Sequence, residues 1–328
     1  MAKGFILEKT TQAFIKELES KGGKPIYKLT PKEARAVLEK IQSQPIDKPM
    51  VSIEDKMISG GPKGKVSIRI VRPHGANEKL PVTMYFHGAG WVMGSASTHD
   101  RLVRELAVGS HSAVVFVNYS LSPEAQFPVP IEEAYAATQY IAKEGKNLNL
   151  DTSHIAVAGD SVGGNMTIAV TLLAKERHGP KFESQVLFYP VTSAEMNTPS
   201  YKQYAEGPWL TKPAMQWFWD SYEPNVNARK NPLVSPLLAP LDQLKGFPQT
   251  LVITDENDVL RDEGEQFASK LMQAGVNVTA MRVLGTTHDF AMLNALAHTP
   301  ATRLAIATAS KYLYESLHKQ AKKGAKAA

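Results

Sequence analysis

The apolar residues of this chain fall into short runs, separated by longer stretches in which apolar positions recur at helical spacing. Most runs do not alternate with polar residues, which favours strands buried on both faces, as in a parallel sheet covered by helices. The second run differs, because Val66, Ile68 and Ile70 alternate with polar residues. The predicted strands span 51–58, 66–71, 82–87, 113–119, 154–158, 185–189, 250–254 and 276–283.

The stretches between these runs predict helices that connect one strand to the next. The predicted helices span 97–108, 129–144, 163–177, 262–274, 289–297 and 300–319. Regular alternation of strand and helix is typical of an open, doubly wound α/β fold. We therefore expect a mostly parallel, twisted sheet of about eight strands with helices on both faces.

Two amphipathic helices are predicted before the first strand. Residues 9–21 carry Phe14, Ile15 and Leu18 on one face. The second helix begins with a capping box, in which Thr30 is the N-cap and Glu33 reaches back to it. Because the apolar face of such a helix needs a partner surface, we expect both helices to pack on the rest of the chain.

An aromatic insertion interrupts the alternation of strands and helices at 191–232. Three of the four tryptophans lie in it. An insertion between sheet strands is well placed to cover the carboxyl ends of the strands, where α/β proteins bind ligands. We expect a cap made of residues 1–50 and 191–232 over a catalytic domain made of 51–190 and 233–328.

The composition is that of an ordinary globular protein, with 43% apolar and 21% charged residues among 328. The absence of cysteine excludes disulfides, thiolate chemistry and cysteine-ligated metals. The first residues hold too short an apolar run for a signal peptide, and no stretch approaches the roughly 20 apolar residues that span a bilayer. We expect a soluble cytoplasmic protein without stable membrane association.

The net charge of +5 is concentrated at the end of the chain, where Lys319, Lys322, Lys323 and Lys326 lie among alanines. Such a segment can contact nucleic acid or an anionic membrane, but a frayed and solvated terminus is the expectation here. Elsewhere, basic and aromatic residues are not interleaved. No nucleic-acid partner is therefore predicted.

The sequence Gly159-Asp160-Ser161-Val162-Gly163 lies between an apolar run and a helical stretch. A strand that turns sharply into a helix, with serine at the tip and glycine two residues to either side, is a nucleophile elbow. The glycines give the strained backbone at Ser161 the room that it needs. The turn presents the hydroxyl beside a helix N-terminus, where negative charge is favoured. Ser161 is therefore a candidate nucleophile.

A glycine-rich loop, His87-Gly88-Ala89-Gly90-Trp91, follows the strand predicted at 82–87. Glycine-rich loops expose backbone N–H groups, and loops of this type in esterases donate to the oxygen of the reacting carbonyl, together with the residue after the nucleophile. We predict an oxyanion hole from Gly88, Ala89, Gly90 and Val162. His87 is expected to brace this loop and not to act as the base.

The acid and the base of a triad are predicted in two later loops. Asp258 follows the strand at 250–254 and is preferred over Asp255, which is too close to the strand end, and over Asp262, which suits the first turn of a helix. His288 follows the strand at 276–283. The order serine, aspartate, histidine is that of α/β-hydrolases.

The chain resembles the hormone-sensitive-lipase-like family of α/β-hydrolase esterases. The matching stretches are HGAGW at 87–91, YSLSPEAQFP at 119–128, GDSVGG at 159–164, DVLRDEG at 258–264 and GTTHDF at 285–290. The resemblance implies an α/β-hydrolase fold with a helical cap, hydrolysis of short- or medium-chain carboxylic esters, and no cofactor or metal. It also implies a homodimer through the edge strand at 276–283.

The predicted reaction is attack of Ser161 on an ester carbonyl, with His288 as base and Asp258 orienting its imidazole. Trp91, Trp209 and Trp217 are predicted to bind the substrate. Three alternatives stay open: a catalytically silent small-molecule receptor on the same fold, an amidase and a thioesterase.

The sequence departs from the family pattern at two of the predicted oxyanion donors. Ala89 stands where glycine is usual, and Val162 where alanine is usual. Both would donate through their backbone N–H, so the chemistry is expected to survive, while the added methyl groups narrow the substrate site. Ser120 and Ser122 also replace usual residues, in a stretch interpreted as a structural turn.

Overall fold

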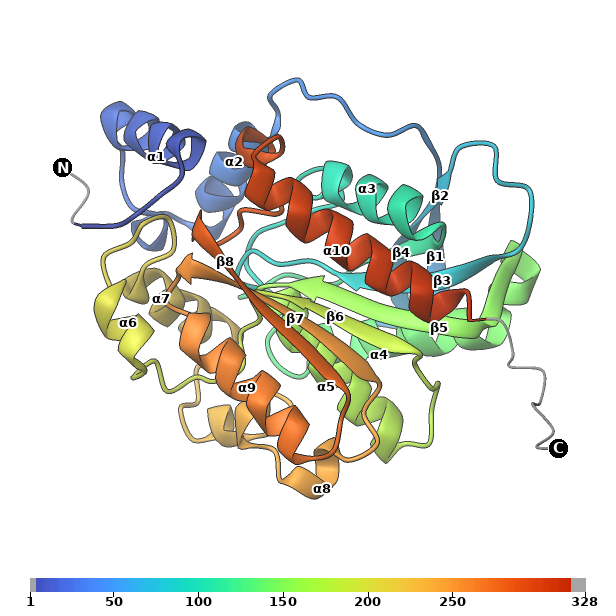
Figure 1. Cartoon of the computed structure of the whole chain (residues 1–328). Coiled ribbons are helices and arrows are strands. Elements are labelled where there is room, and N and C mark those ends of the chain that lie inside the picture. The colour runs from blue at the N-terminus through green and yellow to red at the C-terminus, as the bar shows by residue number, and fades with distance from the viewer. Residues whose placement is uncertain (1–3, 320–328) are drawn as a thin grey trace, which may run out of the picture.

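A single eight-stranded sheet forms the centre of the molecule in the computed structural model, which describes residues 4–319 (Figure 1). Its strand order is β1-β2-β4-β3-β5-β6-β7-β8. The pairs β1–β2 and β2–β4 are antiparallel, and the other neighbours are parallel. The strands are β1 Val51–Ser59, β2 Lys65–Pro73, β3 Leu80–Phe86, β4 Ala113–Asn118, β5 Leu150–Asp160, β6 Ser184–Phe188, β7 Gln249–Asn257 and β8 Val278–Thr287. The predicted doubly wound architecture, with a mostly parallel sheet of about eight strands, is confirmed.

Helices cover both faces of this sheet, as predicted. In Figure 1, α3 and α10 lie on one face, and α4, α5 and α9 lie on the other. The α-helices are α1 Lys9–Lys21, α2 Pro31–Gln42, α3 Asp100–Ser110, α4 Val129–Glu144, α5 Val162–Glu176, α6 Pro199–Gln203, α7 Lys212–Tyr222, α8 Leu241–Leu244, α9 Arg261–Gln273 and α10 Pro300–Leu317. The 3-10 helices are η1 Ile26–Lys28, η2 Gly145–Leu148, η3 Ala228–Lys230, η4 Pro236–Leu238 and η5 Asn294–Leu296.

Burial explains why some strands are continuous apolar runs in the sequence and others mix apolar with polar residues. Every residue of β3 is buried, because helices cover both of its faces and a strand flanks it on either side. The edge strand β8 carries mostly exposed or half-exposed residues over its first eight positions. Continuous apolar runs therefore belong to the middle of the sheet, and mixed runs to its edges.

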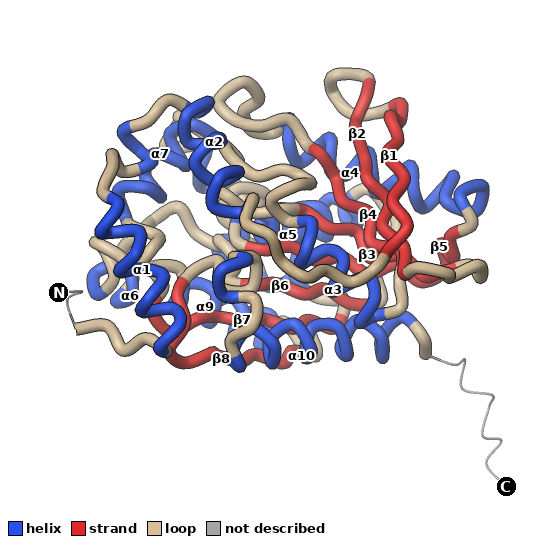
Figure 2. Tube along the Cα trace, turned by 90° about the horizontal axis from the view of Figure 1, so that it is seen from above, coloured by secondary structure: helices blue, strands red, loops and turns tan. Residues whose placement is uncertain are grey.

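The N-terminal helices and the insertion gather at one end of the sheet. Helices α1, α2, α6 and α7 lie at the left of Figure 1, on the side to which the arrows of β7 and β8 point, and Figure 2 shows the same grouping from above. Segment η1 contacts α7 directly. The predicted capping box of α2 is present, since Thr30 accepts from the backbone of Glu33 while the Glu33 carboxylate accepts from the backbone of Thr30.

The helix predicted at 289–297 is wrong. That stretch forms turns and the short 3-10 helix η5. Asp289 has a φ of 66°, which lies outside the helical region. Asn294 donates two hydrogen bonds to Gln42 at the end of α2, from its backbone N–H and its side-chain amide, so a contact distant in the sequence replaces helical bonds.

Two further predictions concern membrane association and the basic residues near the C-terminus. Among residues 4–319, no helix is long and apolar enough to cross a membrane. The basic C-terminal residues Lys322, Lys323 and Lys326 lie outside the described residues.

Candidate active site

The predicted nucleophile elbow is formed between β5 and α5. Strand β5 ends at Asp160, helix α5 begins at Val162, and Ser161 between them has φ 54° and ψ −121°. A Cβ on Gly163 would collide with the carbonyl of Phe86, and one on Gly159 with the carbonyl of Gly163. Only glycine lets the strand and the helix approach this closely, so the motif is a steric requirement of the turn.

The three predicted triad residues meet at the carboxyl edge of the sheet. The Nδ1 atom of His288 lies 2.8 Å from Oδ2 of Asp258, and its Nε2 lies 2.8 Å from Oγ of Ser161. With the proton on Nδ1, Nε2 can accept the hydrogen of the serine hydroxyl. Asp258 also accepts a hydrogen bond from the backbone N–H of Leu260 at 3.0 Å, which fixes its carboxylate.

Charge around the imidazole favours its protonated form. Burial by itself lowers the pKa of His288, but the charges of Asp258 and Asp289 outweigh burial and raise that pKa above its usual value. Asp255 lies nearby with both carboxylate oxygens buried and without a hydrogen-bond partner among the described residues. Burial first, and then the charge of Asp258, raise the pKa of Asp255 well above its usual range.

Two of these carboxylates and the imidazole also have a spacing that could suit a metal ion. Asp255, Asp258 and His288 offer ligand atoms within 4.8 Å of one another. Both ring nitrogens of His288, however, already face Asp258 and Ser161 at hydrogen-bond distance. The arrangement therefore fits proton transfer to and from a serine.

The glycine-rich loop supplies fewer free donors than predicted. The N–H of Gly88 donates to Oδ1 of Asp160 at 3.0 Å, so Gly88 is unsuited to the predicted oxyanion hole. Among the described residues, the N–H groups of Ala89, Gly90 and Val162 have no acceptor. Ala89 and Gly90 line the same cavity as Ser161, and a Cβ on Gly90 would collide with the Phe218 ring of α7.

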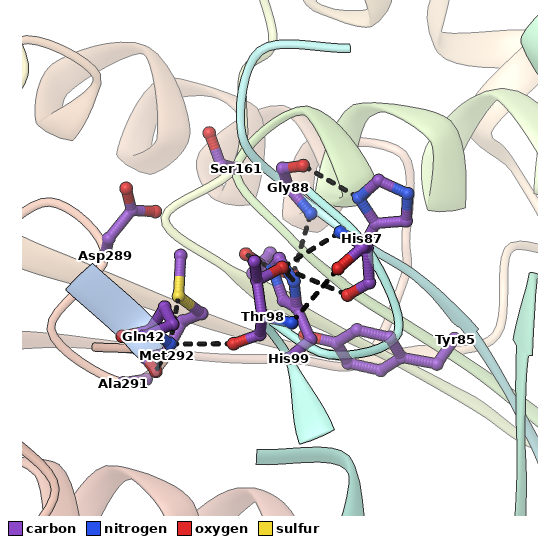
Figure 3. Close-up of polar contacts among 12 residues, drawn as sticks. Gln42, Tyr85, His87, Gly88, Thr98, His99, Ser161, Asp289, Ala291 and Met292 are labelled. Carbon is purple, nitrogen blue, oxygen red and sulfur yellow. Dashed lines mark hydrogen bonds and ion pairs between the residues drawn. The ribbon is translucent and has the colours of Figure 1, made fainter. Parts of the chain in front are cut away.

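A buried polar network holds this loop in place (Figure 3). Asp160 accepts from the Tyr85 hydroxyl at 2.6 Å and lies 3.2 Å from Nε2 of His99. Burial and the neighbouring His99 lower the pKa of His87 to about 3, so its neutral ring donates from Nδ1 to the carbonyl of Gly88 at 2.9 Å. His87 therefore braces the loop, and the base is elsewhere.

A largely apolar cavity of about 260 Å³ opens above Ser161 and His288. The walls come from the N-terminal segment, the loop after β3 and the insertion. They include Ile26, Leu38, Met93, Trp209, Met215 and Phe218. Ligand pockets usually measure about 300–1,000 Å³, so this cavity suits small substrates. Ala89 is part of the wall, whereas Val162 is buried outside it.

Of the three tryptophans predicted to bind substrate, the structure places only Trp209 in the wall of the cavity. Trp91 is completely buried and stacks on Tyr222, with ring centroids 4.0 Å apart. Trp217 packs against Phe218 outside the cavity, at 5.2 Å between centroids. The predictions for Trp91 and Trp217 are therefore corrected, because both rings serve the packing of α7.

Three charged or titratable residues near the reaction centre were missed as functional candidates, and a fourth, Asp255, was considered only as the triad acid. Asp160 and His99 form the network under the loop, Asp255 lies beside the triad, and Asp289 lies in the cavity wall. A signal existed for two of them. Asp160 precedes Ser161 and Asp289 follows His288 in the sequence. A charged side chain next to a catalytic residue is expected to lie close to the reaction centre.

Comparison with known proteins agrees with this geometry. The chain belongs to the alpha/beta hydrolase fold family, whose model matches residues 83–292, and within it to the hormone-sensitive-lipase-like esterases. It is 47% identical to an alpha/beta hydrolase of Acanthamoeba polyphaga mimivirus, over 87% of this chain and 82% of the relative. It is 35% identical to the carboxylesterase NlhH of Mycobacterium tuberculosis, over 75% and 77% respectively. A thermostable esterase from Pseudomonas putida has a similar structure, with TM-score 0.94, 46% identity, and coverage of 96% of this chain and 98% of that one.

Proposed function

We propose that this protein is a serine carboxylesterase that hydrolyses short- to medium-chain carboxylic esters through an acyl-enzyme intermediate. The observation that carries the proposal is the continuous hydrogen-bonded chain from Asp258 through His288 to Ser161, at the tip of an elbow that opens into an apolar cavity. Relatives of the same family are named esterases and carboxylesterases.

The reaction follows from the positions of these side chains. Ser161 Oγ attacks the ester carbonyl carbon while His288 Nε2 takes its proton. Asp258 holds the Nδ1 proton and stabilises the imidazolium. The negative charge on the carbonyl oxygen is received by the backbone N–H groups of Ala89, Gly90 and Val162.

The second half of the reaction uses the same groups. His288 returns the proton to the leaving alcohol as the tetrahedral intermediate collapses, and the acyl group stays on Ser161. Water then loses a proton to His288 and attacks the acyl-enzyme, which releases the acid and restores the serine. No redox step and no further reactant are needed.

The roles of the surrounding segments are part of the proposal. Residues 1–50 and 191–232 act as a cap that excludes water, because they supply most of the cavity wall. We further propose a cytoplasmic enzyme without a nucleic-acid partner or stable membrane association, and a homodimer through β8, which lies at the sheet edge. Analytical ultracentrifugation at micromolar concentration tests the dimer, and a monomer there contradicts it.

A ladder of p-nitrophenyl esters with increasing acyl length tests the proposed activity. The small cavity predicts the highest kcat/KM with short acyl chains and a fall as the chain outgrows the cavity. Ser161→Ala serves as the control that identifies the nucleophile. Matched anilides and thioesters distinguish the amidase and thioesterase alternatives, and binding of esters without turnover would favour the receptor alternative.

A further inference from the structure

The residue after the proposed base carries a carboxylate that the reaction above does not use. Asp289 is 7% exposed and lines the cavity together with Ser161 and His288. Its side chain appears with that of Ser161 in the upper left of Figure 3. The tight turn after His288, closed by bonds from Met292 and Leu293 to the carbonyl of Asp289, holds this residue at a φ of 66°.

The two oxygens of this carboxylate have different surroundings. Oδ2 accepts a hydrogen bond from Nε1–H of Trp209 at 2.8 Å. Oδ1 has no hydrogen-bond partner among the described residues and lies 3.5 Å from Nε2 of His288. The same nitrogen lies 2.8 Å from Ser161 Oγ. Because Nε2 delivers the proton to the leaving oxygen, Oδ1 lies beside the place of the departing alcohol.

A buried carboxylate oxygen without a hydrogen bond is unfavourable, since it has lost its water and the imidazole of His288, at 3.5 Å, replaces that water only in part. Burial raises the pKa of Asp289, while the charge of His288 and the bond from Trp209 act in the opposite direction. A substrate that brings a hydrogen-bond donor or a positive charge to Oδ1 removes this deficit. An anionic substrate at the same place makes it worse.

Trp209 bonds the other oxygen and leaves Oδ1 as the atom without a hydrogen bond. Its indole fixes Oδ2, and Phe14 of α1 packs against the indole with ring centroids 5.6 Å apart. The cap therefore orients Asp289, because both aromatic rings belong to it. With Oδ2 engaged, only Oδ1 remains for a ligand.

We propose that Asp289 is a specificity-determining residue, whose free Oδ1 selects esters with a hydroxyl or cationic group on the alcohol part, close to the ester oxygen. The inference rests on the proposed esterase activity and adds the chemistry of the alcohol to it. Trp209 is the positioning residue that aims the carboxylate.

Three pairs of acetates with nearly equal shape test the selection, since the acyl group is constant. They are 2-hydroxyethyl and propyl acetate, acetylcholine and 3,3-dimethylbutyl acetate, and O-acetylglycolate and isobutyl acetate. The wild-type protein is expected to prefer the first member of the first two pairs in kcat/KM and to discriminate against O-acetylglycolate. A hydrogen bond to a charged group corresponds to a preference of about 10-fold or more.

Asp289→Asn keeps the size of the side chain and an oxygen for Trp209, but replaces Oδ1 by an amide nitrogen. We expect each of these preferences to shrink about 10-fold, and O-acetylglycolate to become a better substrate relative to its neutral partner. Trp209→Phe, which keeps a ring and loses the N–H, should weaken the preferences in the same direction. Loss of packing alone would lower all six rates together and leave the ratios unchanged.

The outcomes separate this inference from the proposed function. If the wild-type protein hydrolyses none of the neutral acetates, the esterase proposal fails. If it hydrolyses the neutral acetates but shows no preference for the hydroxyl or cationic partner, the specificity inference is overturned even when the variants do not fold. Unchanged ratios in a folded Asp289→Asn protein overturn it as well.

Discussion

Replacing Asp160 by asparagine should both destabilise the protein and lower its kcat for ester hydrolysis. Asp160 is completely buried, and its carboxylate receives the Tyr85 hydroxyl at 2.6 Å, the Gly88 N–H at 3.0 Å and His99 Nε2 at 3.2 Å. Burial raises the pKa of Asp160, but the charge and hydrogen bond of His99 and the Tyr85 bond outweigh it, so this pKa lies below its usual value. The network is therefore built around an anion.

The size of the effect follows from the number of bonds. A hydrogen bond to a charged group contributes about 1.5–3 kcal/mol, against about 0.5–1.5 kcal/mol for a neutral one. The amide side chain of the Asp160→Asn variant would keep neutral bonds to Tyr85 and Gly88 and would turn its nitrogen towards His99. The expected loss is about 3 kcal/mol in the free energy of unfolding, which for a chain of this size lowers Tm by roughly 5 °C.

Urea unfolding at pH 7 and kcat with a short p-nitrophenyl ester are the assays. Gly88 anchors the loop that carries two proposed oxyanion donors, and loss of one donor costs about 10²–10³ in kcat. Asp47→Asn, at an exposed aspartate without a side-chain hydrogen bond among the described residues, is the control and should stay within about 0.5 kcal/mol of the wild type. A folded Asp160→Asn protein with wild-type stability and kcat would refute this reasoning.

Acidity provides a second test of the same carboxylate. A carboxylate with a lowered pKa in the folded state stabilises the protein above its unfolded pKa, and this contribution disappears as the pH falls through the folded value. The difference in unfolding free energy between wild type and Asp160→Asn should therefore be constant near neutrality and shrink below about pH 4. A difference that grows on acidification contradicts an anionic Asp160.

Three further predictions follow from the site. Because the pKa of His288 is raised, kcat/KM should increase with pH through an inflection above the usual ~6.5, as initial-rate assays across about pH 5–10 would reveal; an inflection below that value contradicts it. Gly163→Ala should yield little folded protein by circular dichroism, since its Cβ would collide with the Phe86 carbonyl, and normal melting would disprove the collision. Burial raises the pKa of Glu263 to about 8, so the folded state holds a proton that the unfolded state releases above about pH 4, and stability falls as the pH rises towards 8. Glu263→Gln should flatten this decline in thermal melts between about pH 6 and 9; an equally steep decline argues for another group.

The sequence predicts the reacting groups well because their geometry is local or topological. The elbow at Ser161 is a steric consequence of two glycines, which are visible in the sequence itself. The loops that carry Asp258 and His288 follow parallel strands, and the carboxyl ends of parallel strands meet at one edge. Identifying those loops is therefore enough to bring the triad together.

The wall of the cavity is harder to predict because it depends on the rotation of α2 and α7 about their axes. Trp217 and Phe218 are neighbours in α7, yet only Phe218 faces the cavity. The position of Trp91 next to the glycine-rich loop suggests a place in the substrate site, but its ring is buried against Tyr222. Aromatic composition indicates that the insertion contributes to the cavity wall, but it does not indicate which of its rings face inwards.

Contacts between distant residues account for the remaining differences. Nothing near Gly88 in the sequence indicates that its N–H belongs to Asp160, and so the predicted hole contains one donor too many. Asn294 donates its hydrogen bonds to Gln42, which lies 252 residues earlier in the chain, and so it does not continue a helix. The proposed role of Asp289 depends on a hydrogen bond from Trp209, 80 residues earlier in the chain, to one of its two carboxylate oxygens.

The central claim, that Ser161 is an activated nucleophile, is tested most directly by a fluorophosphonate probe and intact-protein mass spectrometry. The wild-type protein should gain one adduct, mapped to Ser161 by peptide sequencing, and should lose its esterase activity in parallel. Ser161→Ala should remain unlabelled and lose about 10⁶-fold in turnover. An unlabelled wild-type protein, or a Ser161→Ala protein that hydrolyses esters at the full rate, would contradict the account.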